Sequence, residues 1–337
     1  MKRKVIKQGH NTLTITLPSE WANRFNIRAG DEINLSERDA GIFISAERHE
    51  DKKRAEFSIT DLDIPTIWKY FMAVYREGYS EVKVQFDPNQ RFDSPYKLFT
   101  THKSDMNYGK KTRPHTPFET IQEITNRFIG FEIIEHHADH CIIKDMAEPS
   151  AKEFDSSLRR VFLLILQMAE ETLEAIRTED TKMLEHMHDI DINLDKFHDY
   201  CIRVLNKTKC RDERKSHLLV TTLYLLELLG DEFKNVAYHI VGDLRDKSLK
   251  NILKLCEMNV NQFKHYYDLY YNFKKEKMRE FSKQDWEIHL YLPKLYLKRP
   301  GKGTSLSDDE LEVFHHFRMM SKYLNALIEL RIQMEFN

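Results

Sequence analysis

The chain has 337 residues, which suggests two or three domains. It contains only 10 Gly and 9 Pro, and no proline falls between Pro149 and Pro293. This stretch has too few turn residues for a β-sandwich or an α/β domain, so we expect long helices there. No run of about 18 apolar residues occurs and the first residues are polar, so the sequence predicts neither a membrane span nor a secretory signal.

The four cysteines show no pattern typical of zinc sites or disulfide frameworks, because no two are spaced as CxxC. They are Cys141, Cys201, Cys210 and Cys256. A reducing, cytoplasmic location is therefore expected.

The formal net charge of −2 hides an uneven distribution. Residues 1–54 carry +3, residues 55–150 carry −4 and the remainder carries −1. The basic excess lies at the extreme N-terminus, where Glu20 is the sole acid against Lys2, Arg3, Lys4, Lys7, Arg24 and Arg28. Charge alone fits either a solvated tail or a binding surface.

The first fifty residues are expected to form short strands around one short helix. Residues 12–17 alternate polar and apolar side chains, which predicts a strand that Pro18 ends. A helix over residues 20–25 follows, and strands are predicted at residues 32–36 and 42–46. So small a unit has few apolar positions, so dimerisation is expected to stabilise it.

Three stretches of this segment, residues 4–9, 14–21 and 27–33, resemble the AbrB/SpoVT/MazE-like domain. The resemblance implies a swapped-hairpin β-barrel dimer over residues 1–50 that binds DNA. It also implies that the residues facing DNA are Arg3, Lys4, Lys7, His10, Asn11 and Arg24.

The segment departs from well-known family members at two places. Ala22 and Asn23 stand where those members carry an arginine pair, and His10-Asn11 replaces a turn that usually holds an arginine. Lysine and arginine contacts to phosphates still give salt-dependent affinity without reading sequence. The alternative is that this domain serves only for dimerisation.

Residues 55–148 alternate strand and helix in the order βαβαββ, which predicts a ferredoxin-like or ACT-like α+β domain. The predicted strands and helices are 56–59, 62–77, 82–86, 117–128, 131–135 and 141–144. The connection over residues 87–116 is long, and we expect it to be disordered.

A cluster of histidines and acids over residues 135–140 falls at the predicted hairpin turn. It fits either an exposed polar tip or a metal site. The polar tip is the simpler interpretation.

Residues beyond 150 are predicted to form two three-helix bundles, over residues 153–243 and 245–337. The expected helices are 154–179, 181–208, 213–243, 245–280, 282–297 and 306–335. Pro293 and the residues around 299–303 are expected to mark the last loop.

Two pairs of acids lie on otherwise apolar helix faces. Asp191 and Asp195 are four residues apart, and so are Glu227 and Asp231, with Gly230 between the latter two. Carboxylates in an apolar stripe must be paired, protonated or bound to metal. The spacing therefore fits either a metal site or ion pairs with Arg203, Lys234 or their neighbours, and Gly230 is expected to leave room for close packing or a ligand.

Residues 191–195 and 227–231 resemble the acidic motifs of PhoU proteins. The resemblance implies two repeated three-helix bundles, a divalent or ferric metal ion (Fe, Zn, Mn or Mg) on Asp191, Asp195, Glu227 and Asp231, and control of phosphate uptake through a phosphate transporter and its sensor kinase. Archaeal relatives join an AbrB-like N-terminus and an α/β insert to this bundle. Leu228 replaces the family's usual arginine, and residues 245–335 show no clear acidic pair, so one of the family's two metal sites is expected to be missing.

The sequence thus predicts a cytoplasmic, dimeric, DNA-binding PhoU-like regulator, not an integral membrane protein and not an enzyme. One alternative is an adaptor that docks on a phosphate transporter or sensor kinase, with the N-terminal barrel only for dimerisation. A lesser alternative is a di-iron carboxylate bundle, since Glu185 precedes His188, and Glu312 precedes His315, by three residues. No catalytic triad, phosphate-cradling loop or nucleotide fingerprint is present.

Overall fold

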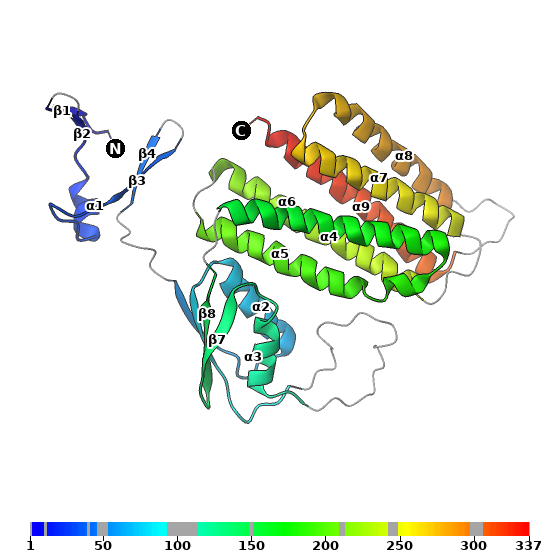
Figure 1. Cartoon of the computed structure of the whole chain (residues 1–337), viewed down its shortest axis with the longest axis horizontal. Helices are drawn as coiled ribbons and strands as arrows, with labels where there is room; N and C mark the ends of the chain where they lie inside the picture. The colour runs from blue at the N-terminus through cyan, green and yellow to red at the C-terminus, as the bar shows by residue number, and fades with distance from the viewer. Residues whose placement is uncertain are drawn as a thin grey trace. The chain divides into compact units, whose positions relative to one another are not determined.

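The computed structural model describes residues 2–9, 12–38, 41–45, 53–92, 114–147, 151–208, 213–241, 249–296 and 306–336. The chain divides into two units, Met1–Lys52 and Lys53–Asn337 (Figure 1). Within the described ranges, no helix combines the length and the apolar character that crossing a lipid bilayer requires.

In its described residues, the N-terminal unit consists of two hairpins and one short helix. Its elements are β1 (Ile6–Gln8), β2 (Thr12–Thr14), α1 (Ser19–Arg24), β3 (Asn34–Arg38) and β4 (Gly41–Ser45). The strands pair antiparallel as β1 with β2 and β3 with β4, in two separate sheets. The strand expected over residues 12–17 is shorter, and the helix begins directly after Pro18, whose backbone is extended.

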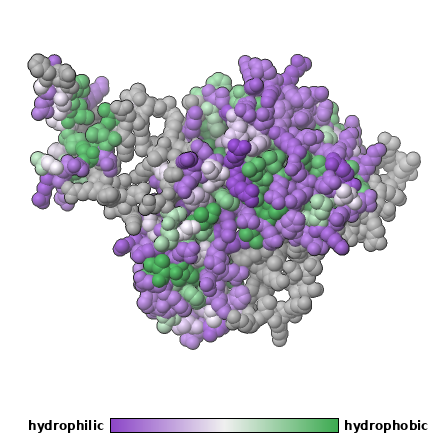
Figure 2. Space-filling view, in the orientation of Figure 1, coloured by the Kyte–Doolittle hydropathy of each residue, from purple (hydrophilic) through white to green (hydrophobic). Residues whose placement is uncertain are grey.

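A single copy of this unit has no hydrophobic core in its described residues. None of the residues whose burial is described is buried, and Leu13, Leu35 and Ile42 are 71%, 63% and 63% exposed. Figure 2 shows apolar residues, in green, at the surface of this unit. The strands described for one chain therefore do not close the barrel that the resemblance implies.

The second unit begins with an α/β layer. Its elements are β5 (Arg54–Ser58), α2 (Ile64–Arg76), β6 (Glu81–Gln85), α3 (Pro117–Thr125), β7 (Phe131–His136) and β8 (His140–Asp145). Local capping explains where both helices start: Asp63 accepts a hydrogen bond from the Thr66 amide, and Thr116 forms a reciprocal capping box with Glu119.

The βαβαββ order matches the prediction, but the sheet is not the ferredoxin-like or ACT-like one that was expected. Its strand order is β5-β6-β8-β7, and β5 pairs parallel to β6 with no strand between them. In a ferredoxin-like split βαβ, another strand separates the two parallel strands. Here the last hairpin instead adds to the free side of β6. Of the predicted long connection, residues 93–113 lie outside the described part of the chain.

In its described residues, the rest of the unit consists mainly of six long helices (Figure 1). They are α4 (Ala151–Thr178), α5 (Met187–Lys207), α6 (Glu213–Ile240), α7 (Leu249–Tyr271), α8 (Met278–Tyr296) and α9 (Asp308–Gln333). The predicted second helix is interrupted, because a 3-10 turn at Thr181–Leu184 precedes α5. Pro293, expected in a loop, lies inside α8 near its end.

The two predicted sets of three helices pack on each other. α4 contacts α5, α6 and α7, and α6 runs along α9. Fully buried side chains from both sets, such as Phe162, Leu226, Phe263 and Phe317, belong to one continuous core. All six helices therefore contribute to a single bundle.

A buried arginine joins the α/β layer to this bundle. Arg203 on α5 is fully buried and donates to the Tyr75 carbonyl at 2.5 Å, the Tyr79 carbonyl at 2.7 Å and Asp145 Oδ2 at 2.6 Å. Lys207, one turn further along α5, also donates to Asp145 Oδ2 at 2.6 Å. These bonds fix α5 against the ends of α2 and β8.

Candidate functional site

Five carboxylates gather between α5 and α6. Asp191, Asp195 and Asp199 follow one another at four-residue spacing on α5, and Glu227 and Asp231 have the same spacing on α6. The two helices approach closely at Gly230, where a Cβ atom would lie 2.1 Å from Leu194 Cδ2. The close packing predicted from Gly230 is thus confirmed.

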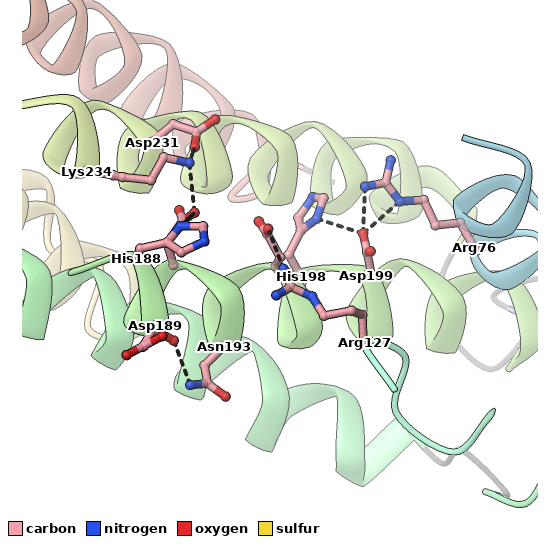
Figure 3. Close-up of polar contacts among 11 residues, drawn as sticks. Arg76, Arg127, His188, Asp189, Asn193, His198, Asp199, Asp231 and Lys234 are labelled. Carbon is pink, nitrogen blue, oxygen red and sulfur yellow. Dashed lines mark hydrogen bonds and ion pairs between the residues drawn. The ribbon is translucent and has the colours of Figure 1, made fainter. Parts of the chain in front are cut away.

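A lysine ammonium bridges the two acidic pairs. Lys234 Nζ donates to Asp191 Oδ2 at 2.8 Å. It also pairs with Asp231, three residues earlier on α6 (Figure 3). Both carboxylates raise the pKa of Lys234 against the effect of burial, so this side chain stays charged. Of the two explanations for the acidic pairs, the structure shows ion pairing with Lys234.

The remaining acids of the predicted site are less well compensated. Asp195 Oδ2 lies 3.7 Å from an Arg127 guanidinium nitrogen, and about a third of its side chain (34%) is exposed. Burial, and then the charge of Asp191, raise the pKa of Asp195 to about 8. Burial, and then Asp231, raise the pKa of Glu227 to about 7. These two carboxyls exchange protons close to neutral pH.

Asp199 extends the cluster toward the α/β layer and was missed by the sequence analysis. Its Oδ1 accepts from Arg76 Nε at 2.8 Å and lies 3.2 Å from His198 Nδ1. Arg76 NH1 also donates to the Tyr224 hydroxyl at 3.0 Å, so it links α2 to both α5 and α6. The four-residue step after Asp195 was a signal that pointed to Asp199. Arg76 and Arg127 come from distant elements and had no local signal.

The predicted metal ligands do not fit a metal ion in this arrangement. Lys234 already places a cation between Asp191 and Asp231. In the described part of the chain, no three of the four predicted ligands bring their oxygen atoms within 4.8 Å of one another. A metal ion at this cluster would have to displace the Lys234 ammonium.

Among the residues that the structure describes, the other predicted metal sites do not bring three ligand atoms together either. Within the described ranges, Glu185, His188, Glu312 and His315 form no common group of ligand atoms. His315 instead lies 3.3 Å from an Arg318 guanidinium nitrogen. The histidine-rich stretch over residues 135–140 forms the tip of the β7–β8 hairpin, where His140 pairs with Asp139 at 2.7 Å.

The basic residues expected to face DNA lie at the surface of the N-terminal unit. Arg3, Lys4 and Lys7 are exposed, and Arg24 is exposed at the end of α1. His10 and Asn11 lie outside the described residues.

Two comparisons found proteins that are similar to parts of this chain. Residues 6–52 match the family described as "Antidote-toxin recognition MazE, bacterial antitoxin". The structure is similar to the crystal structure of the phosphate transport system regulatory protein PhoU from Streptococcus pneumoniae, at 17% identity and a TM-score of 0.45, over 55% of this chain and 94% of that one. A search of curated proteins found no match to this chain.

A MazE/AbrB-like domain forms the N-terminus, and an α/β layer with a six-helix bundle follows it. The bundle carries the charge cluster described above. Its cations are Arg76 on α2, Lys234 on α6 and Arg127, which lies two residues after the end of α3.

Proposed function

We propose that the protein is a dimeric, DNA-binding regulator of phosphate homeostasis, working in the cytoplasm and without enzymatic activity. The observation that carries the proposal is the N-terminal unit, which exposes apolar side chains and basic side chains together. The match of residues 6–52 to the MazE antitoxin family supports it.

The apolar surface of this unit supports the proposal that the protein is a dimer. Leu13 on β2, Leu35 on β3 and Ile42 on β4 are all more than half exposed. An isolated two-stranded hairpin is marginally stable in water. A second copy of the unit would cover these side chains and supply the core that one copy does not have.

The basic side chains of the same unit support the proposal of DNA binding. Arg3, Lys4 and Lys7 lie on and just before β1, and Arg24 lies on α1. In a dimer each of these charges occurs twice, which gives several phosphate contacts on one duplex. Ala22 and Asn23 add no charge, so the affinity is expected to depend strongly on salt and weakly on base sequence.

The proposed role in phosphate control rests on the helical bundle. Its acidic pairs, at residues 191–195 and 227–231, carry the resemblance to PhoU proteins. The pKa of Asp195 near 8 and of Glu227 near 7 make the charge of this cluster adjustable close to neutral pH. Arg76 on α2 forms an ion pair with Asp199 of the cluster. A change in the charge of the cluster would therefore change the interaction between the bundle and the α/β layer.

A second candidate is an adaptor that docks on a phosphate transporter or sensor kinase and uses the N-terminal unit only to dimerise. Two exposed apolar side chains on the bundle favour it, Trp286 and Leu290, which are one turn apart on α8 and 60% and 46% exposed.

Sequencing the genomic DNA fragments that the purified full-length protein retains separates the two candidates. The regulator is expected to retain genomic DNA at low salt, with a modest enrichment of fragments upstream of phosphate-transporter genes, and Lys4→Glu/Lys7→Glu is expected to lose this retention. Charge reversal of two exposed bundle lysines, Lys275 and Lys283, is the matched control. Retention of no DNA by the parent protein would favour the adaptor.

A further inference from the structure

Two histidines and a glutamate that are not part of the acidic cluster come together where α6 packs against α9. They are His239 near the end of α6, and Glu312 and His316, one turn apart on α9. One ligand atom from each lies within 4.8 Å of the other two. We propose that these three side chains bind a divalent transition-metal ion of the Zn²⁺ type.

Both imidazole rings are oriented by carboxylates, as in known metal sites. His239 Nδ1 lies 2.9 Å from Asp309 Oδ1, and His316 Nδ1 lies 2.5 Å from Glu232 Oε2. A metal-binding histidine almost always donates a hydrogen bond from its other ring N–H to such a partner. This bond fixes the tautomer and raises the basicity of the nitrogen that binds the metal. Here the Nδ1 atoms are engaged by carboxylates, so each imidazole would offer its Nε2 atom to the ion.

The rings are held in place by packing as well. The His239 and His316 rings stack with their centroids 5.5 Å apart and their planes 29° from parallel. Their side chains are only 19% and 12% exposed, whereas Glu312 is exposed at the surface. The site thus has two ligands held in position in the interior, His239 and His316. Its third ligand, Glu312, lies on the solvent side, from which an ion would enter.

The donor set selects the kind of ion. Two imidazoles and one carboxylate suit Zn²⁺ and similar transition metals, whereas Mg²⁺ and Ca²⁺ prefer oxygen donors alone. Three protein ligands leave a fourth position for water. With zinc-to-ligand bonds of about 2.0–2.1 Å, the ligand atoms would be roughly 3.4 Å apart, so the site closes slightly around the ion. The exposed Glu312 side chain can make this movement.

An ion at this site would join α6 to α9, and so the first set of three helices to the second. The alternative explanation is that the His239–Asp309 and His316–Glu232 contacts join the same two helices without a metal. The two explanations differ in what they predict for metal affinity.

The test is a Zn²⁺ titration of the full-length protein, first freed of metal with a chelator, in competition with a chromogenic chelator. One site is expected in the parent, weakened at least 100-fold by His316→Gln and by His239→Gln, and 10- to 100-fold by Glu232→Gln. His315→Gln, the neighbouring exposed histidine, is the matched control and should bind as the parent does. Asp191→Asn/Asp231→Asn should also keep the site, which separates it from the acidic cluster.

A Co²⁺ titration gives a second readout that does not depend on affinity. The parent is expected to show the intense visible absorption of a four- or five-coordinate Co²⁺ ion, and Glu312→Gln, a surface change that should not disturb folding, is expected to alter it. Equal Zn²⁺ affinity of parent, His239→Gln and His316→Gln, or a Co²⁺ spectrum equal to that of the hydrated ion, would overturn the proposal.

Discussion

The ammonium of Lys234 on α6 lies 2.8 Å from the carboxylate of Asp191 on α5, and this ion pair is almost completely enclosed, with side chains 18% and 4% exposed. It stands where the spacing of the acids had allowed a metal ion. The bundle therefore supplies its own cation between the two acidic pairs.

Removing this cation should be costly. Lys234→Met leaves Asp191 buried without its partner, and breaking one side of a buried pair typically costs about 3–5 kcal/mol. Urea denaturation of the full-length protein measures the loss. Lys234→Met/Asp191→Asn should recover part of it, because the uncompensated charge is gone, and an unchanged midpoint for Lys234→Met would show that the ion pair contributes nothing.

The acidic cluster should make stability fall as the pH rises. The pKa of Asp195 is raised to about 8 and that of Glu227 to about 7, above the values near 4 of unfolded chains. The folded state thus binds more protons than the unfolded state between about pH 4 and 8, so the free energy of unfolding decreases over that window. Because Asp195 is a third exposed, we expect a loss of only about 1–2 kcal/mol.

Urea denaturation between pH 5 and 9 measures this dependence. Asp195→Asn should flatten the profile and stabilise the protein at pH 8. Asp189→Asn, an exposed acid on the same helix, is the matched control and should leave the profile unchanged. A parent whose stability rises from pH 5 to 8 would contradict the arrangement of charges.

Gly230→Ala should destabilise the bundle although alanine favours a helix by about 1 kcal/mol. The new Cβ atom would lie 2.1 Å from Leu194 Cδ2, and Leu194 is fully buried. Overpacking of this kind typically costs about 1–3 kcal/mol. Thermal unfolding measures the change, and combination with Leu194→Ala should give a loss smaller than the sum of the two. A Gly230→Ala protein that melts above the parent would show that α5 and α6 do not approach this closely.

Arg203→Met should loosen the α/β layer from the bundle. Arg203 is fully buried and makes three hydrogen bonds to groups at the ends of α2 and β8. Its removal leaves Asp145 with Lys207 alone. We expect hydrogen exchange to speed up in α2 and β8 while α7 and α9 stay protected, and Lys207→Met to have a smaller effect because its side chain is partly exposed. Equal exchange in Arg203→Met and the parent would contradict this role.

Local patterns in the sequence predicted local features well. Period-two alternation located the strand that begins at Thr12, and helical spacing placed Asp191 and Asp195 on one face beside the buried Leu194. Gly230 correctly indicated a close helix approach. Each of these signals depends on neighbours within a few residues, which is what periodicity reports.

Features that depend on distant residues were not predicted. The position of β8 between β6 and β7 depends on which edge of the sheet the last hairpin joins. The order βαβαββ along the chain is compatible with more than one order of strands in the sheet. Likewise, Arg76 and Arg127 reach the acids of α5 from elsewhere in the chain. Arg203 was a candidate partner of the acidic pairs, yet it bonds to Asp145, 58 residues earlier.

The central claim is that the N-terminal unit binds DNA through its basic side chains. Fluorescence anisotropy of a labelled mixed-sequence duplex, titrated with full-length protein from 50 to 300 mM salt, tests it most directly. We expect log K to fall linearly with log salt concentration, and Lys4→Glu/Lys7→Glu to weaken binding and flatten the slope, while Lys275→Glu/Lys283→Glu does neither. Binding that is absent at low salt, or that is the same for Lys4→Glu/Lys7→Glu as for the parent, would contradict the account.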